Sequence, residues 1–232
     1  MRPQSERFSF EVPFRRFMLA GFGKAIYVSI VILIARAASM KKITSDTKKG
    51  RGRPALLERT AGAAVAETLF HREGYDQLGI AALCDALGVR QPALYRVFGS
   101  KAGLFEAALA QYGSSRFASF VAEEIARAKT ADALKRNVLL RAAETYTAAP
   151  ERRGCLALET AYGSADPSAR AAANTLVENV RKMLTDRFSS LGAQEPAANA
   201  DGVILIMRGL SSEARSGRTA NALRNAVEAL TG

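Results

Sequence analysis

The sequence predicts an all-α protein in which a three-helix unit is followed by a larger helical domain. Two observations carry this prediction. Apolar residues recur with helical spacing through most of residues 55–216, and a short helix, a glycine turn and a second short helix lie between Ile80 and Phe98. The composition agrees, because 48% of the 232 residues are hydrophobic, which is enough to bury a full core.

An apolar stretch near the N-terminus is too short to span a membrane. Phe17–Ala38 is interrupted by Lys24 and Arg36, and its uncharged part, Ala25–Ala35, has 11 residues where a spanning helix needs about 20. We expect Met40 to be the true initiator and everything before it, residues 1–39, to be a non-native or disordered extension. A signal peptide and a membrane tether are the alternatives, and no stable membrane association is expected.

Residues 40–54 form a basic arm. The net charge of the chain is +11. Residues 1–54 contain twelve basic and three acidic residues, so most of the excess positive charge lies in this segment. Such an arm favours contacts with phosphates. Within it, Arg51-Gly52-Arg53-Pro54 has the core pattern of an AT-hook, so Arg51 and Arg53 are expected either to enter a narrow A·T minor groove or to be attracted loosely to phosphates.

The first helix of the three-helix unit is expected from Ala55 to Arg72, and Gly74 ends it. Its buried stripe would pack over the next two helices and consists of residues at i, i+3, i+4 and i+8. These residues are Ala61, Ala64, Val65 and Leu69.

The second and third helices carry the clearest pattern of the chain. Ile80, Leu83, Cys84 and Leu87 share one face of an eight-residue helix. Gly88 stops that helix because glycine reaches positive φ without a steric clash. A new helix can begin at Gln91, where Pro92 suits the first turn, and its buried stripe is Leu94, Val97 and Phe98. This is the spacing of a helix-turn-helix, whose second helix lies in the DNA major groove.

Several further motifs of residues 55–101 occur in the same register. They are Gly74-Tyr75-Asp76, Ala86-Leu87-Gly88-Val89, Gln91-Pro92-Ala93-Leu94-Tyr95-Arg96-Val97-Phe98, and Gly99-Ser100-Lys101 followed by Leu104-Phe105. Together they resemble the DNA-binding domain of the tetracycline-repressor (TetR) family. Three positions depart from the family pattern. Gly79 stands where the family usually has a Ser or Thr cap, Arg90 stands where Ser is frequent, and Val97 stands where His is common. These departures bear on the operator sequence and not on the fold.

The residues of the third helix that avoid its buried stripe are candidates for DNA contacts. Gln91 suits adenine, Arg96 suits the O6 and N7 acceptors of guanine, and the methyl group of Ala93 suits a thymine methyl. Tyr95 and Lys101 are better suited to phosphates, although Tyr95 is also a candidate packing residue. Arg90 is expected to influence which bases or phosphates are touched.

Residues 102–232 are expected to form a helical domain that binds an effector and dimerises. The helices expected after a connecting helix through Tyr112 include a segment around Phe117–Ile125, Asp132–Thr147, Ser168–Leu191 and Ala197–Ser216. The run Val203–Met207 is apolar almost all round, which predicts burial on several sides. The resemblance implies that the last two of these helices pair across a two-fold axis in a homodimer, and a monomeric core is the alternative.

The resemblance also implies a cavity for an unidentified small-molecule effector. Glu151-Arg152-Arg153-Gly154-Cys155-Leu156 resembles an element that lies beside that cavity in many members. The candidate lining residues are apolar or aromatic: Phe117, Phe120, Val121, Leu139, Tyr146, Cys155, Leu158, Tyr162 and Leu176. Cys155 is expected to be a packing residue, with redox activity as the alternative.

Catalytic and metal-binding classes have little support in the sequence. Two cysteines and a single histidine, His71, give no disulfide framework, zinc pattern or catalytic dyad. We therefore predict no enzyme activity, metal or cofactor, and a structural role for His71. The predicted function is a cytoplasmic, ligand-released repressor that binds a pseudo-palindromic DNA operator as a homodimer. The alternative is an architectural DNA-binding protein that uses the Arg-Gly-Arg-Pro arm.

Overall fold

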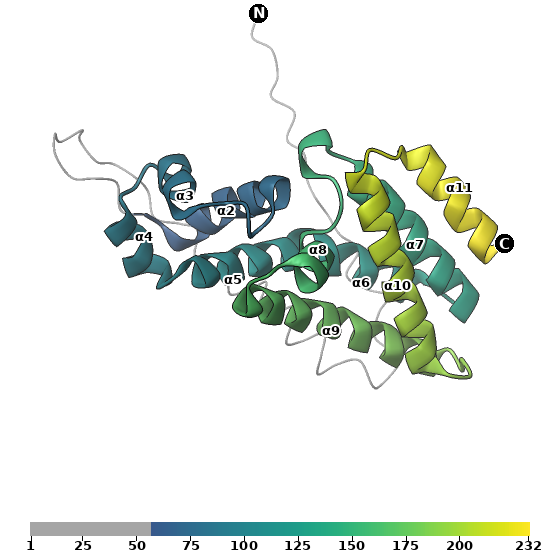
Figure 1. The fold of residues 1–232 in the computed structure, drawn as a ribbon. Coiled ribbons are helices and arrows are strands. Elements are labelled where there is room, and N and C mark those ends of the chain that lie inside the picture. The colour runs from purple at the N-terminus through teal and green to yellow at the C-terminus, as the bar shows by residue number, and fades with distance from the viewer. Residues whose placement is uncertain (1–56) are drawn as a thin grey trace, which may run out of the picture. The chain divides into compact units, whose positions relative to one another are not determined.

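The computed structural model describes residues 57–232, and this part of the chain consists of helices and loops without a strand (Figure 1). The predicted all-α fold is confirmed. The helices are α2 (Arg59–Glu73), α3 (Ile80–Leu87), α4 (Gln91–Phe98), α5 (Lys101–Tyr112), α6 (Ala118–Arg127), α7 (Ala131–Thr147), α8 (Leu156–Gly163), α9 (Pro167–Ser190), α10 (Pro196–Arg215) and α11 (Ala220–Thr231), with a π-helical segment η1 (Gly113–Phe117) and a 3-10 turn η2 (Pro150–Arg152).

The expectations for the N-terminal extension and the basic arm, including Arg51 and Arg53, lie outside the described residues. Among residues 57–232, no helix combines the length and apolar character required to cross a bilayer.

Helix α2 begins at Arg59, later than the expected Ala55. Glu58 caps it, because its carboxylate accepts hydrogen bonds from the backbone N–H groups of Thr60 and Ala61 at 3.0 and 2.7 Å. The same two hydrogen bonds lower the pKa of Glu58, and the bond from Ala61 has the larger effect.

The expected buried stripe of α2 is wrong at two of its four positions, although Leu69 packs against the core and Ala64 is half-buried. Ala61 and Val65 are exposed, and Val65 keeps 41% of its surface in solvent. The buried residues are instead Gly62, Ala63, Ala66, Glu67, Phe70 and His71. The error has a physical cause: Glu67 and His71 are buried as partners of each other, and a pattern based on hydrophobicity places such residues in solvent.

The helix-turn-helix has the predicted boundaries. Gly88 adopts φ 64°, and its N–H and that of Val89 close the end of α3 on Asp85 and Cys84. Leu83 and Leu94 are fully buried and join the two helices to one core, with Cys84 and Phe98 only slightly exposed. The short turn thus fixes the orientation of α4 relative to α3. The face of α4 opposite Leu94 remains exposed to solvent.

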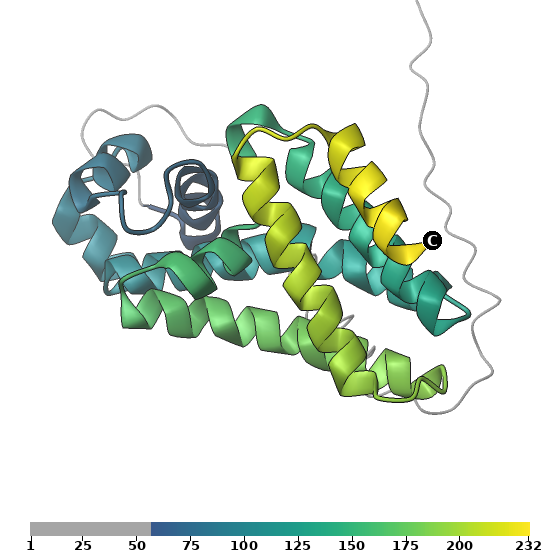
Figure 2. The same cartoon turned by 45° about the vertical axis from the view of Figure 1, so that its right-hand side comes forward.

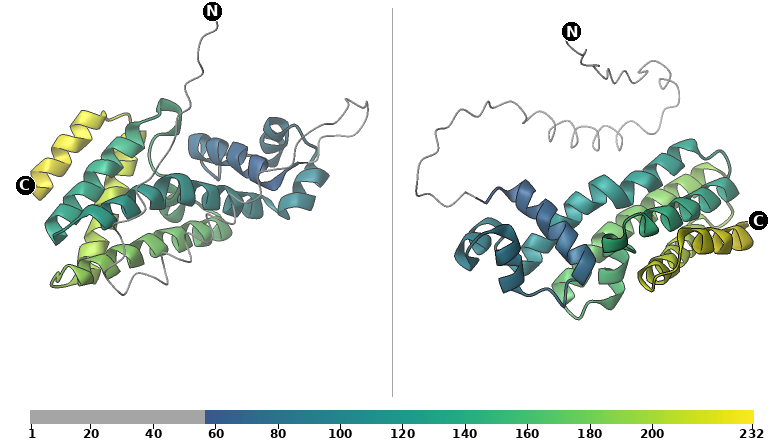
Figure 3. Two further views of the ribbon diagram at one scale, coloured as in Figure 1. Left: turned by 180° about the vertical axis from the view of Figure 1, so that it is seen from behind. Right: turned by 90° about the horizontal axis from the view of Figure 1, so that it is seen from above.

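Helices α5 to α11 form the rest of the described unit. Helix α2 packs along α5, α8 packs on α9, and α10 lies against both α7 and α9 (Figure 2). Helix α11, which was not predicted from the sequence, covers α7 at the end of this unit opposite the helix-turn-helix (Figure 3). One continuous core of buried side chains runs from Ala66 to Val227, so α5 belongs to the packing of both domains.

Candidate DNA-binding site and effector core

The open face of α4 carries the predicted recognition residues. Gln91, Tyr95 and Arg96 are exposed and Ala93 is half-buried, whereas Leu94 on the opposite side is fully buried. The Gln91 Nε2 atom donates a hydrogen bond to the Tyr95 hydroxyl at 3.1 Å. This bond orients both side chains along the same face of the helix, and Arg96 remains separate from them.

Arginine residues flank α4 at both ends. Arg90 is the N-cap residue of the helix, and its side chain is exposed and makes no capping bond. At the other end, Arg59 of α2 donates from Nη1 to the Val97 carbonyl at 2.7 Å and lies 5.3 Å from the centre of the Phe98 ring. Arg59 was not predicted from the sequence, because only the fold brings the start of α2 to the end of α4.

Lys101 is half-buried. Its Nζ lies 4.1 Å from the centre of the Tyr75 ring, a cation–π arrangement. Burial lowers the pKa of Lys101, and the carboxylates of Asp76 and Asp166 oppose that shift. The predicted phosphate contact therefore requires the ammonium to leave this ring.

The turn between α2 and α3 is bonded to the loop between α8 and α9. Asp76 accepts hydrogen bonds from the Ser164 hydroxyl and the Ala165 N–H, both at 3.0 Å, and Tyr75 donates to Asp166 at 3.2 Å. Burial and the Asp166 charge raise the pKa of Tyr75 to about 12. These bonds tie the helix-turn-helix to the C-terminal helices, beside a cavity of about 160 Å³.

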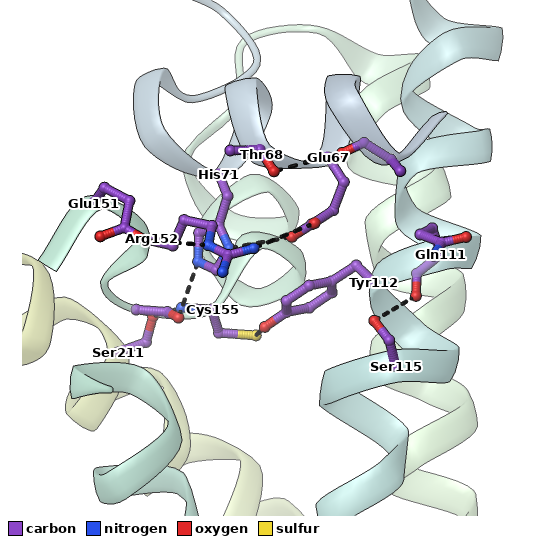
Figure 4. A network of polar contacts seen from close by, with 12 residues as sticks. Glu67, Thr68, His71, Gln111, Tyr112, Ser115, Glu151, Arg152, Cys155 and Ser211 are labelled. Carbon is purple, nitrogen blue, oxygen red and sulfur yellow. Dashed lines mark hydrogen bonds and ion pairs between the residues drawn. The ribbon is translucent and has the colours of Figure 1, made fainter. Parts of the chain in front are cut away.

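A buried polar network links α2 to the segment that precedes α8 (Figure 4). His71 is 2% exposed, its Nε2 lies 3.1 Å from the Gly154 carbonyl oxygen, and its Nδ1 lies 3.6 Å from Glu67. Arg152 lies 3.8 Å from the other oxygen of Glu67. The bond to a carbonyl requires a proton on Nε2, so His71 presents Nδ1 to the carboxylate. The structure thus places His71 in a structural network.

Most of the predicted effector residues gather in the core of the C-terminal helices. All but two of them are at most 3% exposed: Phe117, Phe120, Val121, Leu139, Tyr146, Cys155 and Leu158. Leu176 is partly buried and packs against them. Tyr162 is the exception, because its ring is 43% exposed and lies under the Arg208 guanidinium at 3.8 Å. It lies on the outer side of α8, apart from the buried candidates.

Cys155 is a buried thiol. Its Sγ accepts a hydrogen bond from the Tyr112 hydroxyl at 3.3 Å, and its backbone N–H donates to Ser211 at 2.8 Å. Burial raises the pKa of Cys155 to about 11. A thiol of this kind is protonated at neutral pH, which supports the packing role over the redox alternative.

The glycine turn leaves one face of α4 open, and this is the arrangement of a helix-turn-helix DNA-binding protein. The comparisons agree: the family model described as bacterial regulatory proteins, tetR family, matches residues 63–108. The repressor BdcR of Escherichia coli (strain K12) is 30% identical over 177 residues, which are 76% of this chain and 89% of BdcR. The chain therefore belongs to the TetR family of DNA-binding transcriptional regulators.

Two further comparisons extend this result. The repressor ComR of Escherichia coli (strain K12) is 31% identical over 133 residues, 57% of this chain and 63% of ComR. A solved structure of the TetR family regulator CifR, a cysteine mutant in complex with 26-base-pair operator DNA, is 26% identical, with a TM-score of 0.64 over 76% of this chain and 97% of CifR.

Proposed function

We propose that the protein is a ligand-released repressor that acts in the cytoplasm as a homodimer on a pseudo-palindromic operator. One observation carries the proposal: Gln91, Tyr95 and Arg96 are exposed together on α4, which Arg59 and the α3 turn hold in place. The similarity to BdcR and ComR, both named repressors, and to CifR, solved with operator DNA, supports it.

The roles of the DNA-contacting residues follow from their chemistry. Arg96 would bind guanine, Gln91 adenine, and Ala93 a thymine methyl. Tyr95 and Arg90 would contact phosphates, as would Lys101 once released from the Tyr75 ring. Arg51 and Arg53 would add contacts from the arm.

The dimer is proposed to form through α9 and α10. On α10, Val203, Ile204 and Met207 are buried, but Leu205 is 68% exposed. Small or polar residues lie on the same side of the helix as Leu205: Ala198, Gly209 and Ser212 are exposed, and Gly202 is half-buried. Small residues allow a second helix to approach closely, and a two-fold dimer presents two recognition helices to two half-sites about 34–36 Å apart.

Ligand release follows if the effector binds better to the conformation that does not fit the operator. The bonds of Asp76 and Tyr75 to the α8–α9 loop provide a route for that change. A shift of α8 and α9 would then turn α3 and α4 relative to the partner subunit.

The test is a binding titration of the full chain against the DNA immediately upstream of its own gene, with random DNA as competitor and with salt varied. We expect tight binding limited to a pseudo-palindromic footprint. Binding that ignores sequence and disappears at modest salt would contradict the proposal, and it would favour an architectural protein that depends on the basic arm.

A further inference from the structure

A cluster of hydrogen-bonding side chains lies within the core of the C-terminal helices. Tyr112 of α5, Tyr146 of α7 and Cys155 before α8 are each at most 1% exposed. Tyr112 donates its hydroxyl hydrogen to Cys155 (Figure 4). The Tyr146 hydroxyl, in contrast, is buried and makes no hydrogen bond of ordinary geometry among the described residues, and its polar neighbour is the weakly accepting sulfur of Cys155.

A buried hydroxyl without a partner destabilises a folded protein, and a phenylalanine would fill almost the same space without that loss. Such a hydroxyl is available to donate a hydrogen bond to a molecule that enters the core.

The surroundings favour an uncharged molecule, because the Glu159 carboxylate lies beside the cluster and accepts a hydrogen bond from the Ser211 hydroxyl at 2.6 Å. Burial, and after it the neighbouring Cys155, raises the pKa of both Tyr112 and Tyr146 well above the ordinary value, and the Glu159 carboxylate adds to the shift of Tyr146. Both phenols therefore stay protonated and act as donors. An environment that disfavours a negative charge on its own side chains also disfavours an anionic ligand.

The walls of the cluster are aromatic. The ring of Phe117 is stacked at 6.2 Å from that of Tyr112, and the ring of Phe120 meets Tyr146 edge-on at 6.4 Å. Phe117 belongs to η1, the π-helical segment that follows Tyr112 directly. Such segments are rare and occur frequently at functional sites.

We propose that Tyr146, with Tyr112 and Cys155 beside it, is the polar subsite of the effector site, and that the effector is a small, uncharged, largely apolar molecule whose oxygen accepts a hydrogen bond, such as a ketone, aldehyde or ester. This inference rests on the ligand response proposed above. It adds the chemical class of the ligand and the residue that selects it.

The subsite is adjacent to the DNA-binding helices. The Tyr112 ring meets the His71 ring of α2 edge-on at 5.4 Å, and His71 is bonded to Gly154, the residue before Cys155. A ligand that displaces Tyr112 or Cys155 therefore acts on α2, which also holds the end of α4 through Arg59.

The experiment uses three probes that share one ring and differ in a single property: acetophenone accepts a hydrogen bond, ethylbenzene does not, and benzoate is charged. Their dissociation constants are measured by calorimetry on the full chain. We expect acetophenone to bind about tenfold more tightly than ethylbenzene, the ratio for one hydrogen bond, and benzoate to bind no better than ethylbenzene. Tyr146→Phe should abolish the preference, and Tyr162→Phe, which changes an exposed ring, should keep it.

Thermal unfolding provides a readout without any probe. Tyr146→Phe should unfold at the temperature of the wild type or above it, because the substitution removes a hydroxyl without a partner. A wild type that binds acetophenone no better than ethylbenzene, a preference for benzoate, or a preference that survives in Tyr146→Phe would each overturn the proposal. Operator titration of the same samples separates the two proposals: sequence-specific DNA binding without the ketone preference refutes the subsite alone, and loss of sequence-specific binding refutes the regulator.

Discussion

Arg96 is the exposed side chain of α4 best suited to reading a base. A guanidinium binds the O6 and N7 atoms of guanine with two hydrogen bonds, and such a pair contributes about 1 to 3 kcal/mol of discrimination. We expect Arg96→Ala to weaken operator binding by that amount while binding to random DNA changes little. Competition titrations measure both.

The control for Arg96 is Arg72→Ala. Arg72 is also exposed, but it lies at the end of α2 and pairs with Glu73 at 2.7 Å. We expect this substitution to leave the ratio of operator to random binding unchanged. Equal losses on both DNAs for Arg96→Ala would exclude base recognition by this residue.

The two cysteines give a prediction about pH. Burial raises the pKa of Cys84 and raises that of Cys155 to about 11. Because the thiolate is the reactive form, the native protein should react very slowly with a thiol reagent at pH 7 to 8, and the rate at Cys155 should rise about tenfold per pH unit up to its pKa. Rapid reaction of both thiols in denaturant is the control. Fast modification of the native protein near neutral pH would restore the redox alternative.

At the scale of the helices, Gly103 shows how closely α5 follows α4. A Cβ atom on Gly103 would clash with the Phe98 carbonyl oxygen, a backbone atom that cannot simply rotate away. Gly103→Ala should therefore push the two helices apart, lower the free energy of unfolding by about 1 to 3 kcal/mol and weaken operator binding. Denaturant unfolding and the operator titration measure these two effects.

Gly163→Ala is the matched control for Gly103→Ala. Like Gly103, Gly163 lies in a helix and does not have a positive φ. Unlike Gly103, it has nothing within 4 Å of an added Cβ. Its substitution should change stability by less than about 1 kcal/mol, in the favourable direction given by helix propensity. If both variants were as stable as the wild type, the close packing of α4 on α5 would not hold.

Local signals made α3 and α4 predictable from the sequence. Gly88 and Pro92 end one helix and start the next through their own backbone preferences, and no distant residue is needed. Helix α2 was harder, because the burial of Glu67 and His71 depends on each other and on Gly154 from a distant segment. Helix α11 was missed because only Leu223 and Val227 of its residues are buried.

The candidate site likewise has a part that could be predicted from the sequence and a part that could not. The exposed residues of α4 could be predicted, since a single helix places them together. The neighbours of Lys101 and Tyr146 could not, because Tyr75, Tyr112 and Cys155 reach them only through packing between helices.

The proposed function requires a homodimer, and the exposed leucines of the single chain indicate where its interface would lie. Leu205 is 68% exposed on α10 and Leu230 is 63% exposed on α11, so the two leucines are comparable in a single chain. They differ in position, because only α10 lies beside α9 at the proposed two-fold face.

Leu205→Glu should therefore separate the dimer, whereas Leu230→Glu should not. A carboxylate buried at a helix–helix interface would face its own symmetry mate, and two desolvated like charges oppose association. We expect the molar mass from light scattering to fall from that of two chains to that of one for Leu205→Glu. Operator affinity should also fall, because each subunit would then bind its half-site independently. Leu230→Glu should match the wild type in both measurements. A dimer that withstands Leu205→Glu but dissociates with Leu230→Glu would move the interface to α11 and require a different spacing of the recognition helices.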